Sequence, residues 1–283
     1  MKLKVFSSGS DGNATIVIAN GKNILIDLGL TRKQIEANLN TMNLSISDLD
    51  AILITHEHVD HTKAFQAFLK EVNIPIYLSK GTLNSIYEGY KACGKIKQVE
   101  MIDKRYNEGS IIILNKKENS YLYESVNISS VFIDVLPAFH DAAETIGFVI
   151  HEGEKKLTYL TDTGYVHESI WPTIMDSDAY ILESNHDPEI LMASNRPYNL
   201  KIRILSDHGH MSNEESMVTL ANVMGPNTKL VMHAHVSQEC NLSEIIELTR
   251  SKVFNSFGID TNGVKFVILH PHPSEEYDIW KSL

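Results

Sequence analysis

Residues 50–61, Asp-Ala-Ile-Leu-Ile-Thr-His-Glu-His-Val-Asp-His (DAILITHEHVDH), join a short apolar run to three histidines and an aspartate. The β-branched bias of the run Asp50–Thr55 predicts a buried central strand. Because alternate side chains of an extended segment share a face, His56 and His58 can present both imidazoles to one point. A turn into a helix at Asp60 and His61 would bring a carboxylate and a third imidazole close to that point. The pattern predicts a site for two metal ions a few ångströms apart.

The composition is that of a globular, acidic protein. The 283 residues are 43% hydrophobic and 22% charged, which excludes global disorder, and the formal net charge is −11. This charge argues against wrapping long nucleic acid by bulk electrostatics, although a local basic face is compatible with it. Cys93 and Cys240 cannot make a disulfide framework, and no apolar run is as long as a membrane span. Since the first residues lack the apolar stretch of a signal peptide, we expect a soluble, cytoplasmic protein without membrane contacts.

The order of the predicted elements indicates a single α/β domain over residues 1–283. Strand patterns cover residues 3–6, 14–19, 23–28, 50–55, 76–78, 111–114, 120–125, 131–136, a hairpin over 147–160, 178–183, 229–235 and 264–269. Helical spacing covers residues 31–40, 61–72, 82–91, 213–223 and 242–257. Both halves are rich in strands with helices between them, which favours one sandwich of two sheets covered by helices.

Further acidic and histidine residues stand at the ends of predicted strands. These are Asp27, His140, Asp162 in a Thr-Asp-Thr-Gly turn, and His235. Together with residues 55–61 (THEHVDH), and in this order, they resemble the metallo-β-lactamase-fold hydrolases over nearly the whole chain. The resemblance implies an α/β fold built as a four-layer αββα sandwich.

The resemblance also implies a set of metal ligands. They are His56, His58, His140 and Asp162 for one divalent ion, and Asp60, His61, Asp162 and His235 for the other. Asp162 would bridge the two ions, and Asp27 would orient the loop that carries the ligands. His233, on the same strand face as His235, is the alternative for the last ligand. Because the set contains no sulfur, Zn²⁺ or Mn²⁺ is expected, with Fe²⁺ as an alternative.

This ligand set predicts hydrolysis of an anionic substrate. Five neutral imidazoles, two carboxylates, two divalent ions and one hydroxide sum to +1, which attracts anions. Metal binding lowers the pKa of water from 15.7 to about 7, so metal-bound hydroxide is the expected nucleophile. Only 73 residues separate Asp162 from His235, too few for the inserted domain of the RNA-processing β-CASP branch. Residues 7–13 (SSGSDGN), 183–187 (ESNHD) and 234–237 (AHVS) are similar to the YycJ-like (WalJ-like) branch, which implies 5′-to-3′ exonuclease action on double-stranded DNA.

Three residues are candidates for catalysis beyond metal binding. His210, in Gly-His-Met-Ser-Asn, resembles the non-ligand histidine that tRNA 3′-processing relatives place beside the scissile phosphate. The resemblance implies that it is a general acid or a phosphate-binding group. The alternatives are a structural role for His210 at a helix entry, or His208 in its place. Asp60 and His186 are the other catalytic candidates.

Two segments are candidates for contacts with phosphate or nucleic acid. Ser8, Ser10 and Asn13 lie in a loop whose glycines would let backbone N–H groups approach an oxyanion. Lys201 and Arg203 would share one face of an extended segment and form a local basic patch for DNA. An ordinary turn and a solvated loop are the alternatives. Two other functions stay open, namely a hydrolase of small thioesters, lactones or cyclic phosphodiesters, and a metal-stabilised scaffold or sensor.

Overall fold

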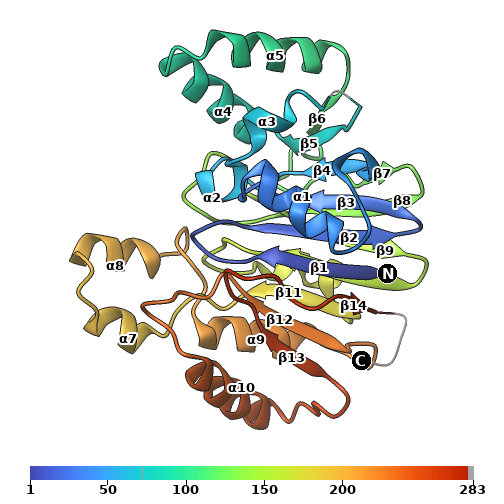
Figure 1. Cartoon of the computed structure of the whole chain (residues 1–283). Coiled ribbons are helices and arrows are strands. Elements are labelled where there is room, and N and C mark those ends of the chain that lie inside the picture. Colours follow the sequence, from blue (N-terminus) through green and yellow to red (C-terminus); the bar gives the residue numbers. More distant parts are fainter. Residues whose placement is uncertain (72, 280–283) are drawn as a thin grey trace.

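The structure, a computed structural model, describes residues 1–71 and 73–279. Its strands are β1 (Lys2–Ser7), β2 (Ala14–Ala19), β3 (Lys22–Ile26), β4 (Ala51–Leu53), β5 (Ile76–Ser79), β6 (Ile111–Leu114), β7 (Val126–Ile128), β8 (Val131–Pro137), β9 (Ile146–Glu152), β10 (Lys155–Leu160), β11 (Ala179–Glu183), β12 (Leu230–Ala234), β13 (Lys265–Ile268) and β14 (Tyr277–Asp278). In this described part they form two sheets of seven strands, in the orders β14-β1-β2-β3-β4-β5-β6 and β13-β12-β11-β10-β9-β8-β7 (Figure 1).

Helices cover the outer face of each sheet. The helices of the described residues are α1 (Arg32–Asn40), α2 (Val59–Thr62), α3 (Phe65–Phe68), α4 (Lys80–Ala92), α5 (Ile96–Asn107), α6 (Trp171–Ile174), α7 (Pro188–Ala193), α8 (Tyr198–Ile204), α9 (Asn213–Val223) and α10 (Ser243–Phe257). Helices α1, α3, α4 and α5 pack on the first sheet, and α6, α9 and α10 pack on the second. The capping box of Ser212 and Glu215 begins α9, as expected for a helix entry at this point.

Most strands of both sheets are buried on two faces. In β3, Ile24 and Ile26 lie in the core between the sheets, whereas Leu25 lies in the core under the helices. In β11, Ile181 faces the other sheet, and Tyr180 packs among the helix-covered residues. The alternation gives three apolar layers between four layers of secondary structure. The predicted four-layer αββα fold is therefore confirmed.

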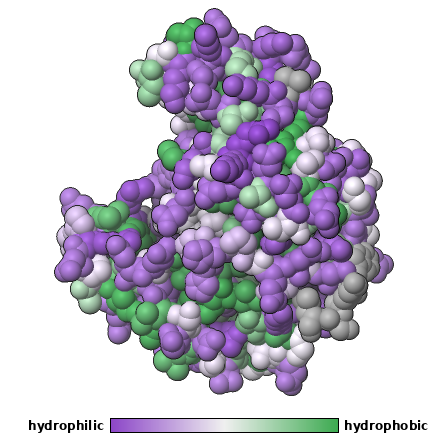
Figure 2. Space-filling view, in the orientation of Figure 1, coloured by the Kyte–Doolittle hydropathy of each residue, from purple (hydrophilic) through white to green (hydrophobic). Residues whose placement is uncertain are grey.

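The sheets also bring many strand ends to one edge. Strands β3 to β6 are parallel to one another, and so are β10 to β13. The carboxyl ends of parallel strands meet at the same edge, where ligands bind in open α/β sheets. Two helical pairs, α4–α5 and α7–α8, protrude on either side of this edge, and the surface between them is indented (Figure 2).

Two predicted elements are wrong in detail. The predicted strand 120–125 is a loop in which Tyr123 makes one isolated bridge. The strand that pairs with β8 is instead β7, and the tight turn at Ser129 sets this pairing. The predicted helix 61–72 is split into α2 and α3, because the Ala64 amide donates to the Leu28 carbonyl, at 2.8 Å, instead of continuing the helix. The last residue of that prediction, Val72, lies outside the described residues.

Four helices of the described residues were not predicted, namely α5, α6, α7 and α8. Helix α8 overturns the expectation that Lys201 and Arg203 share a face of an extended segment, since residues two apart on a helix point in different directions. Lys201 is buried, and its ammonium donates to the carbonyls of Met192 and Ser194, both at 2.7 Å. In the part of the chain that the structure describes, no helix is long and apolar enough to cross a membrane.

Candidate metal centre

The site begins with three residues whose backbone is left-handed just beyond strand ends. Asp27 follows β3 with φ of 63°, Asp162 follows β10 with φ of 54°, and His235 follows β12 with φ of 52°. Residues other than glycine rarely adopt this conformation, and when they do, they cluster at functional sites. Each of these residues is at most 3% exposed. The fold thus holds three buried, strained polar residues at one edge.

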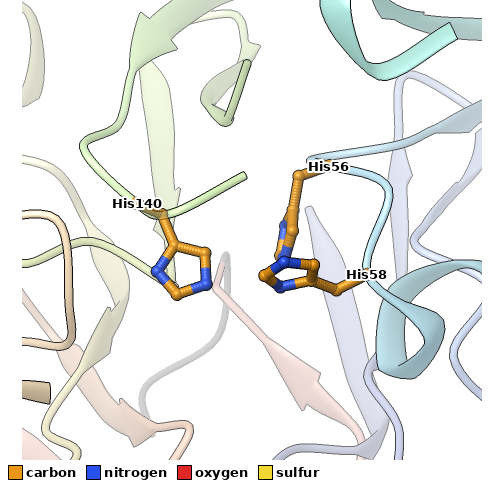
Figure 3. Close-up of side chains that lie close together, drawn as sticks. All are labelled: His56, His58 and His140. Atoms are coloured by element: carbon orange, nitrogen blue, oxygen red, sulfur yellow. The ribbon is translucent and has the colours of Figure 1, made fainter. Parts of the chain in front are cut away.

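Ligand atoms gather around these residues in overlapping groups. Among the described residues, the groups whose atoms all lie within 4.8 Å of one another are His56, His58 and His140; Asp60, His61 and His235; His56, His61 and Asp162; and Asp162, Glu183, His210 and His235. The ring centroids of His56 and His58 are 4.6 Å apart, and that of His140 is 5.2 Å from His56. Figure 3 shows these three imidazoles pointing toward one another across a gap between two chain segments. Asp162 Oδ2 lies 3.2 Å from His61 Nε2 and its Oδ1 lies 3.9 Å from His140 Nε2, so this carboxylate stands between the two sets of histidines, as expected of a bridging residue.

Asp27 holds the histidine-rich loop in place. Its carboxylate accepts the Thr55 amide at 2.8 Å and contacts Nδ1 of His61 at 2.8 Å. The Thr55 hydroxyl adds a contact to Nδ1 of His56 at 3.0 Å. Burial raises the pKa of Asp27, and the adjacent His61 ring opposes this rise. With Nδ1 of both histidines engaged from behind, their Nε2 atoms face the cluster.

Glu183, which the sequence analysis did not assign, holds the other side. It ends β11, and its side chain is 0% exposed. Its Oε1 contacts Nδ1 of His210 at 2.8 Å and Nδ1 of His235 at 3.0 Å, and its Oε2 accepts the Thr163 amide at 2.8 Å. Burial alone would raise the pKa of Glu183, but the two histidines lower it to about 2. The sequence did contain a signal for Glu183, namely a charged residue at the end of an apolar strand, close to the strand ends that carry Asp162 and His235.

The chemistry of these atoms fits a divalent cation. In the described residues, His56 Nε2, Asp162 Oδ2 and His235 Nε2 are buried and have no hydrogen-bond partner. Unpartnered buried polar atoms are costly, and imidazole nitrogens and carboxylate oxygens are metal ligands. Burial lowers the pKa of His56 well below its usual value, which favours the neutral form that binds metal. Burial also works against charge on His235, yet the surrounding carboxylates raise its pKa to about 10, so this pocket attracts positive charge.

The structure also separates the alternative histidines. His235 is in the ligand groups, whereas His233 is buried with its ring stacked on Phe266. His210 is in a ligand group, whereas His208 is exposed. His186 is 1% exposed and belongs to none of the groups found in the described part of the chain, so the structure does not place it with them.

The predicted serine and asparagine contacts divide into two kinds. Ser8 and Asn13 are buried under the histidine loop, where the Ser8 hydroxyl accepts the His235 amide at 2.9 Å and Asn13 Nδ2 lies 2.9 Å from His61 Nε2. These contacts support the ligand loop from within the protein. Ser10, by contrast, is exposed and lines a cavity.

That cavity adjoins the ligand groups and has a volume of about 130 Å³. Its wall contains Ser10, Asn185, Arg196, Arg203 and His210. Arg203 pairs with Asp141, and Arg196 pairs with Glu239 at 2.9 Å. The two arginines, rather than Lys201, are the cations beside the candidate metal centre.

Comparison with known proteins identifies the family. A family model described as a beta-lactamase superfamily domain matches residues 22–234. The chain is 33% identical over 258 residues to Exodeoxyribonuclease YycJ of Bacillus anthracis, which covers 91% of this chain and 90% of that protein. It is 33% identical over 252 residues to Exodeoxyribonuclease WalJ of Streptococcus pneumoniae serotype 2, with 88% of this chain and 86% of that protein covered.

Solved structures agree on the fold. The metallo-beta-lactamase fold protein YhfI from Bacillus subtilis matches with a TM-score of 0.64 at 14% identity, over 98% of this chain and 99% of that one. The short form of human tRNase Z matches with a TM-score of 0.59 at 19% identity, over 84% of this chain and 93% of that one. Similarity at such identities shows the fold alone. With the family match, the relatives and the cluster of ligand atoms together, the chain belongs to the beta-lactamase superfamily and is a metal-dependent hydrolase of the metallo-β-lactamase fold.

Proposed function

We propose that the protein is a phosphodiesterase with two metal ions that acts as a 5′-to-3′ exonuclease on double-stranded DNA. The observation that carries this proposal is that Asp162 joins two groups of ligand atoms beside a cavity lined by arginines. The relatives named exodeoxyribonuclease, which match along most of their length, support DNA as the substrate. Strand polarity and the duplex form come from the resemblance to the YycJ-like branch. We take residues 1–283 as one catalytic domain.

The assignment of ligands follows the groups of atoms. His56, His58 and His140 would hold one ion, and Asp60, His61 and His235 the other, with Asp162 between them. Bound divalent ions, Zn²⁺ or Mn²⁺, would lower the pKa of water enough to supply a nucleophile at neutral pH and would offset the charge of the phosphate. Asp27 and Glu183 position the ligands His61 and His235 through their far ring nitrogens, and Glu183 holds His210 in the same way.

His210 is suited to protonate the leaving oxygen. Its Nδ1 is held by Glu183 at 2.8 Å, so Nε2 is the nitrogen left for the cavity that the ring lines. The Glu183 carboxylate fixes the orientation of the ring, as a carboxylate behind an acid–base histidine does, so that Nε2 can donate a proton to a bound substrate. The His210 side chain is 19% exposed, enough to reach a bound substrate, whereas His186 is buried.

The cavity beside His210 is suited to a phosphate group of the DNA strand. Arg196 and Arg203 offer planar donors that bind phosphate oxygens in pairs. Glu183 and Asp27 each add one negative charge behind the ligand histidines, which lowers the charge sum of the centre from +1 to −1, so the attraction for anions depends on these arginines more than the sequence alone predicts. Each arginine would exchange its contact with Glu239 or Asp141 for the phosphate.

The test is cleavage of end-labelled duplex DNA, single-stranded DNA and RNA by the purified protein with Mn²⁺ or Zn²⁺. Asp162→Asn is the control variant, since it weakens both ligand groups that contain this residue. Stepwise release of nucleotides from the 5′ ends of the duplex by the wild type, and none by the variant, is the expected result. Loss of nucleotides from 3′ ends would refute the polarity. Absence of any polymer cleavage by metal-loaded protein would refute the proposal and favour a hydrolase of small thioesters, lactones or cyclic phosphodiesters.

A further inference from the structure

Five aromatic residues from distant parts of the chain form a surface cluster beside the candidate metal centre. They are Tyr121, Phe139, Tyr165, His167 and His208, here called the aromatic platform. Phe139 and Tyr165 are stacked, with ring centroids 4.5 Å apart and planes at 19°. The His167 ring lies 5.7 Å from that of Tyr121 and 6.3 Å from that of Tyr165. The rings therefore form one connected group.

The platform is open to solvent. Tyr121 is 43% exposed, His167 and His208 are exposed, and Phe139 and Tyr165 are half-buried. Aromatic rings that serve only as core would be covered, as Phe148 is at 0% exposure. A cleft of about 220 Å³ runs along the platform and is lined by Tyr121, Phe139, His208 and His140. Because His140 belongs to the ligand groups, the cleft and the metal centre share a wall.

The platform is fixed to the metal centre through one short turn. The Thr163 hydroxyl contacts the Phe139 amide at 3.0 Å and the Tyr165 carbonyl at 2.7 Å. The Gly164 amide donates to the Phe139 carbonyl at 2.8 Å, and Thr163 also binds Glu183. The turn that positions Asp162 thus positions the two stacked rings, so their distance from the metal centre is set by the fold.

We propose that the aromatic platform binds a nucleobase of the degraded DNA strand by stacking, so that the strand enters the metal centre locally unpaired. The inference rests on the proposed nuclease function and adds how the end of the duplex is held. His140 lines the cleft of the platform and Gly209 lines the arginine cavity, and the Gly209 carbonyl contacts His140 Nδ1 at 2.9 Å, so the two hollows are neighbours. A single nucleotide could therefore place its base in the cleft of the platform and its phosphate in the arginine cavity.

The energetics favour this use of the rings. Stacking of a base on an aromatic side chain tolerates any base, as a nuclease without sequence preference requires. It repays part of the cost of unpairing a terminal base. Since the local charges of Lys116 and Glu144 at the cleft pair with each other, at 2.8 Å, the cleft itself is suited to a neutral base rather than to a phosphate.

The test combines a change in the protein with a change in the DNA. Three 5′-labelled duplexes carry an abasic site at the first, second or third nucleotide of the degraded strand, and a fourth is intact. Wild-type kcat/KM should fall by about 5- to 150-fold on one abasic duplex, the range for loss of one stacked base. Tyr121→Ala should be slowed on intact DNA and should lose little more on that abasic duplex, because both changes remove the same contact.

Two further variants separate the ring from other roles of Tyr121. Tyr121→Phe keeps the ring and removes the hydroxyl that contacts His167 and Ser169, so it should show the same fold loss of kcat/KM on the abasic duplex as the wild type. Tyr106→Ala removes an aromatic side chain of similar exposure, 52%, on α5, which belongs neither to the platform nor to the lining of its cleft, and should have no effect. Equal cleavage of all four duplexes would refute base stacking on the platform. So would fully additive effects of the abasic site and of Tyr121→Ala. Either result would leave the proposed nuclease function intact. Cleavage of none of them would overturn both.

Discussion

Replacing Glu183 by Gln tests whether this buried carboxylate orients the metal ligands. Its two oxygens have different partners, since Oε1 contacts Nδ1 of His210 and His235, and Oε2 accepts the Thr163 amide. If the amide oxygen of Gln faces the histidines, its NH₂ group meets the Thr163 N–H. If the oxygen faces Thr163, the NH₂ group meets the rings of His210 and His235. Each Nδ1 must then accept a hydrogen bond, so the ring hydrogen moves to Nε2. On His235 this hydrogen blocks metal binding.

The size of the effect depends on which hydrogen bond the Gln side chain fails to make. One hydrogen bond to a charged group contributes about 1.5–3 kcal/mol, and in either orientation of Gln at least one such bond is missing. If the histidines are left without it, metal affinity should fall about 10- to 100-fold, which is the usual effect of removing an outer partner of a ligand histidine. Turnover should fall further, because Glu183 also holds His210.

The assay is metal affinity by competition with a chromogenic chelator, together with thermal unfolding of the metal-free protein. Asp178→Asn is the matched control, because Asp178 precedes the same strand at its other end and accepts the Lys156 amide at 2.9 Å. The control should lower stability and leave metal affinity unchanged. If Glu183→Gln binds metal as tightly as the wild type, Glu183 does not orient the ligands and the reasoning is refuted.

Two stability predictions test the scaffold around the site. Glu144 accepts hydrogen bonds from the Gly81 amide at 2.6 Å and from the Tyr123 hydroxyl at 2.9 Å. Burial tends to raise the pKa of Glu144, but Lys116 and these donors lower it. The contribution of Glu144 to the free energy of unfolding is therefore present above pH 4.5 and is lost as the pH falls. Glu144→Gln should therefore cost about 1–2 kcal/mol in urea unfolding at pH 7 and progressively less below pH 4, whereas a constant cost at all pH values would contradict this sign. Gly164→Ala should cost about 1–3 kcal/mol, because its Cβ would lie 2.3 Å from the Asp207 carbonyl oxygen, while Gly89→Ala, with open space around it, should be neutral or stabilising. If the two alanine variants have equal urea midpoints, the turn at Gly164 accommodates a Cβ without loss of stability and the prediction is wrong.

The sequence was most informative where chemistry and chain order coincide. The histidines and aspartate of residues 56–61 are neighbours along the chain, so their convergence follows from local geometry. His140, Asp162 and His235 required the resemblance, because a lone polar residue after a strand does not indicate which other strands meet it. The sandwich itself was predictable from the apolar strand patterns.

What the sequence missed depends on contacts between distant segments. Glu183 was overlooked because its partners come from three other strands or loops. Lys201 was misread because the alternation of NLKIR suggests a strand, whereas the segment is helix α8 and the ammonium is bound by the carbonyls of Met192 and Ser194. Tyr121 was placed in a strand, since nothing in its local sequence indicates the rings of distant residues that it meets at the surface.

The most direct test of a two-ion centre is the number of ions bound per chain. Native mass spectrometry of the protein, saturated with Mn²⁺ or Zn²⁺ and exchanged into volatile buffer, counts them without reference to any substrate. We expect two ions on the wild type and no more than one on Asp162→Asn, because the Asp162 carboxylate contacts His140 of one ligand group and His61 of the other. One ion on the wild type, or two ions held equally well by the variant, would contradict it.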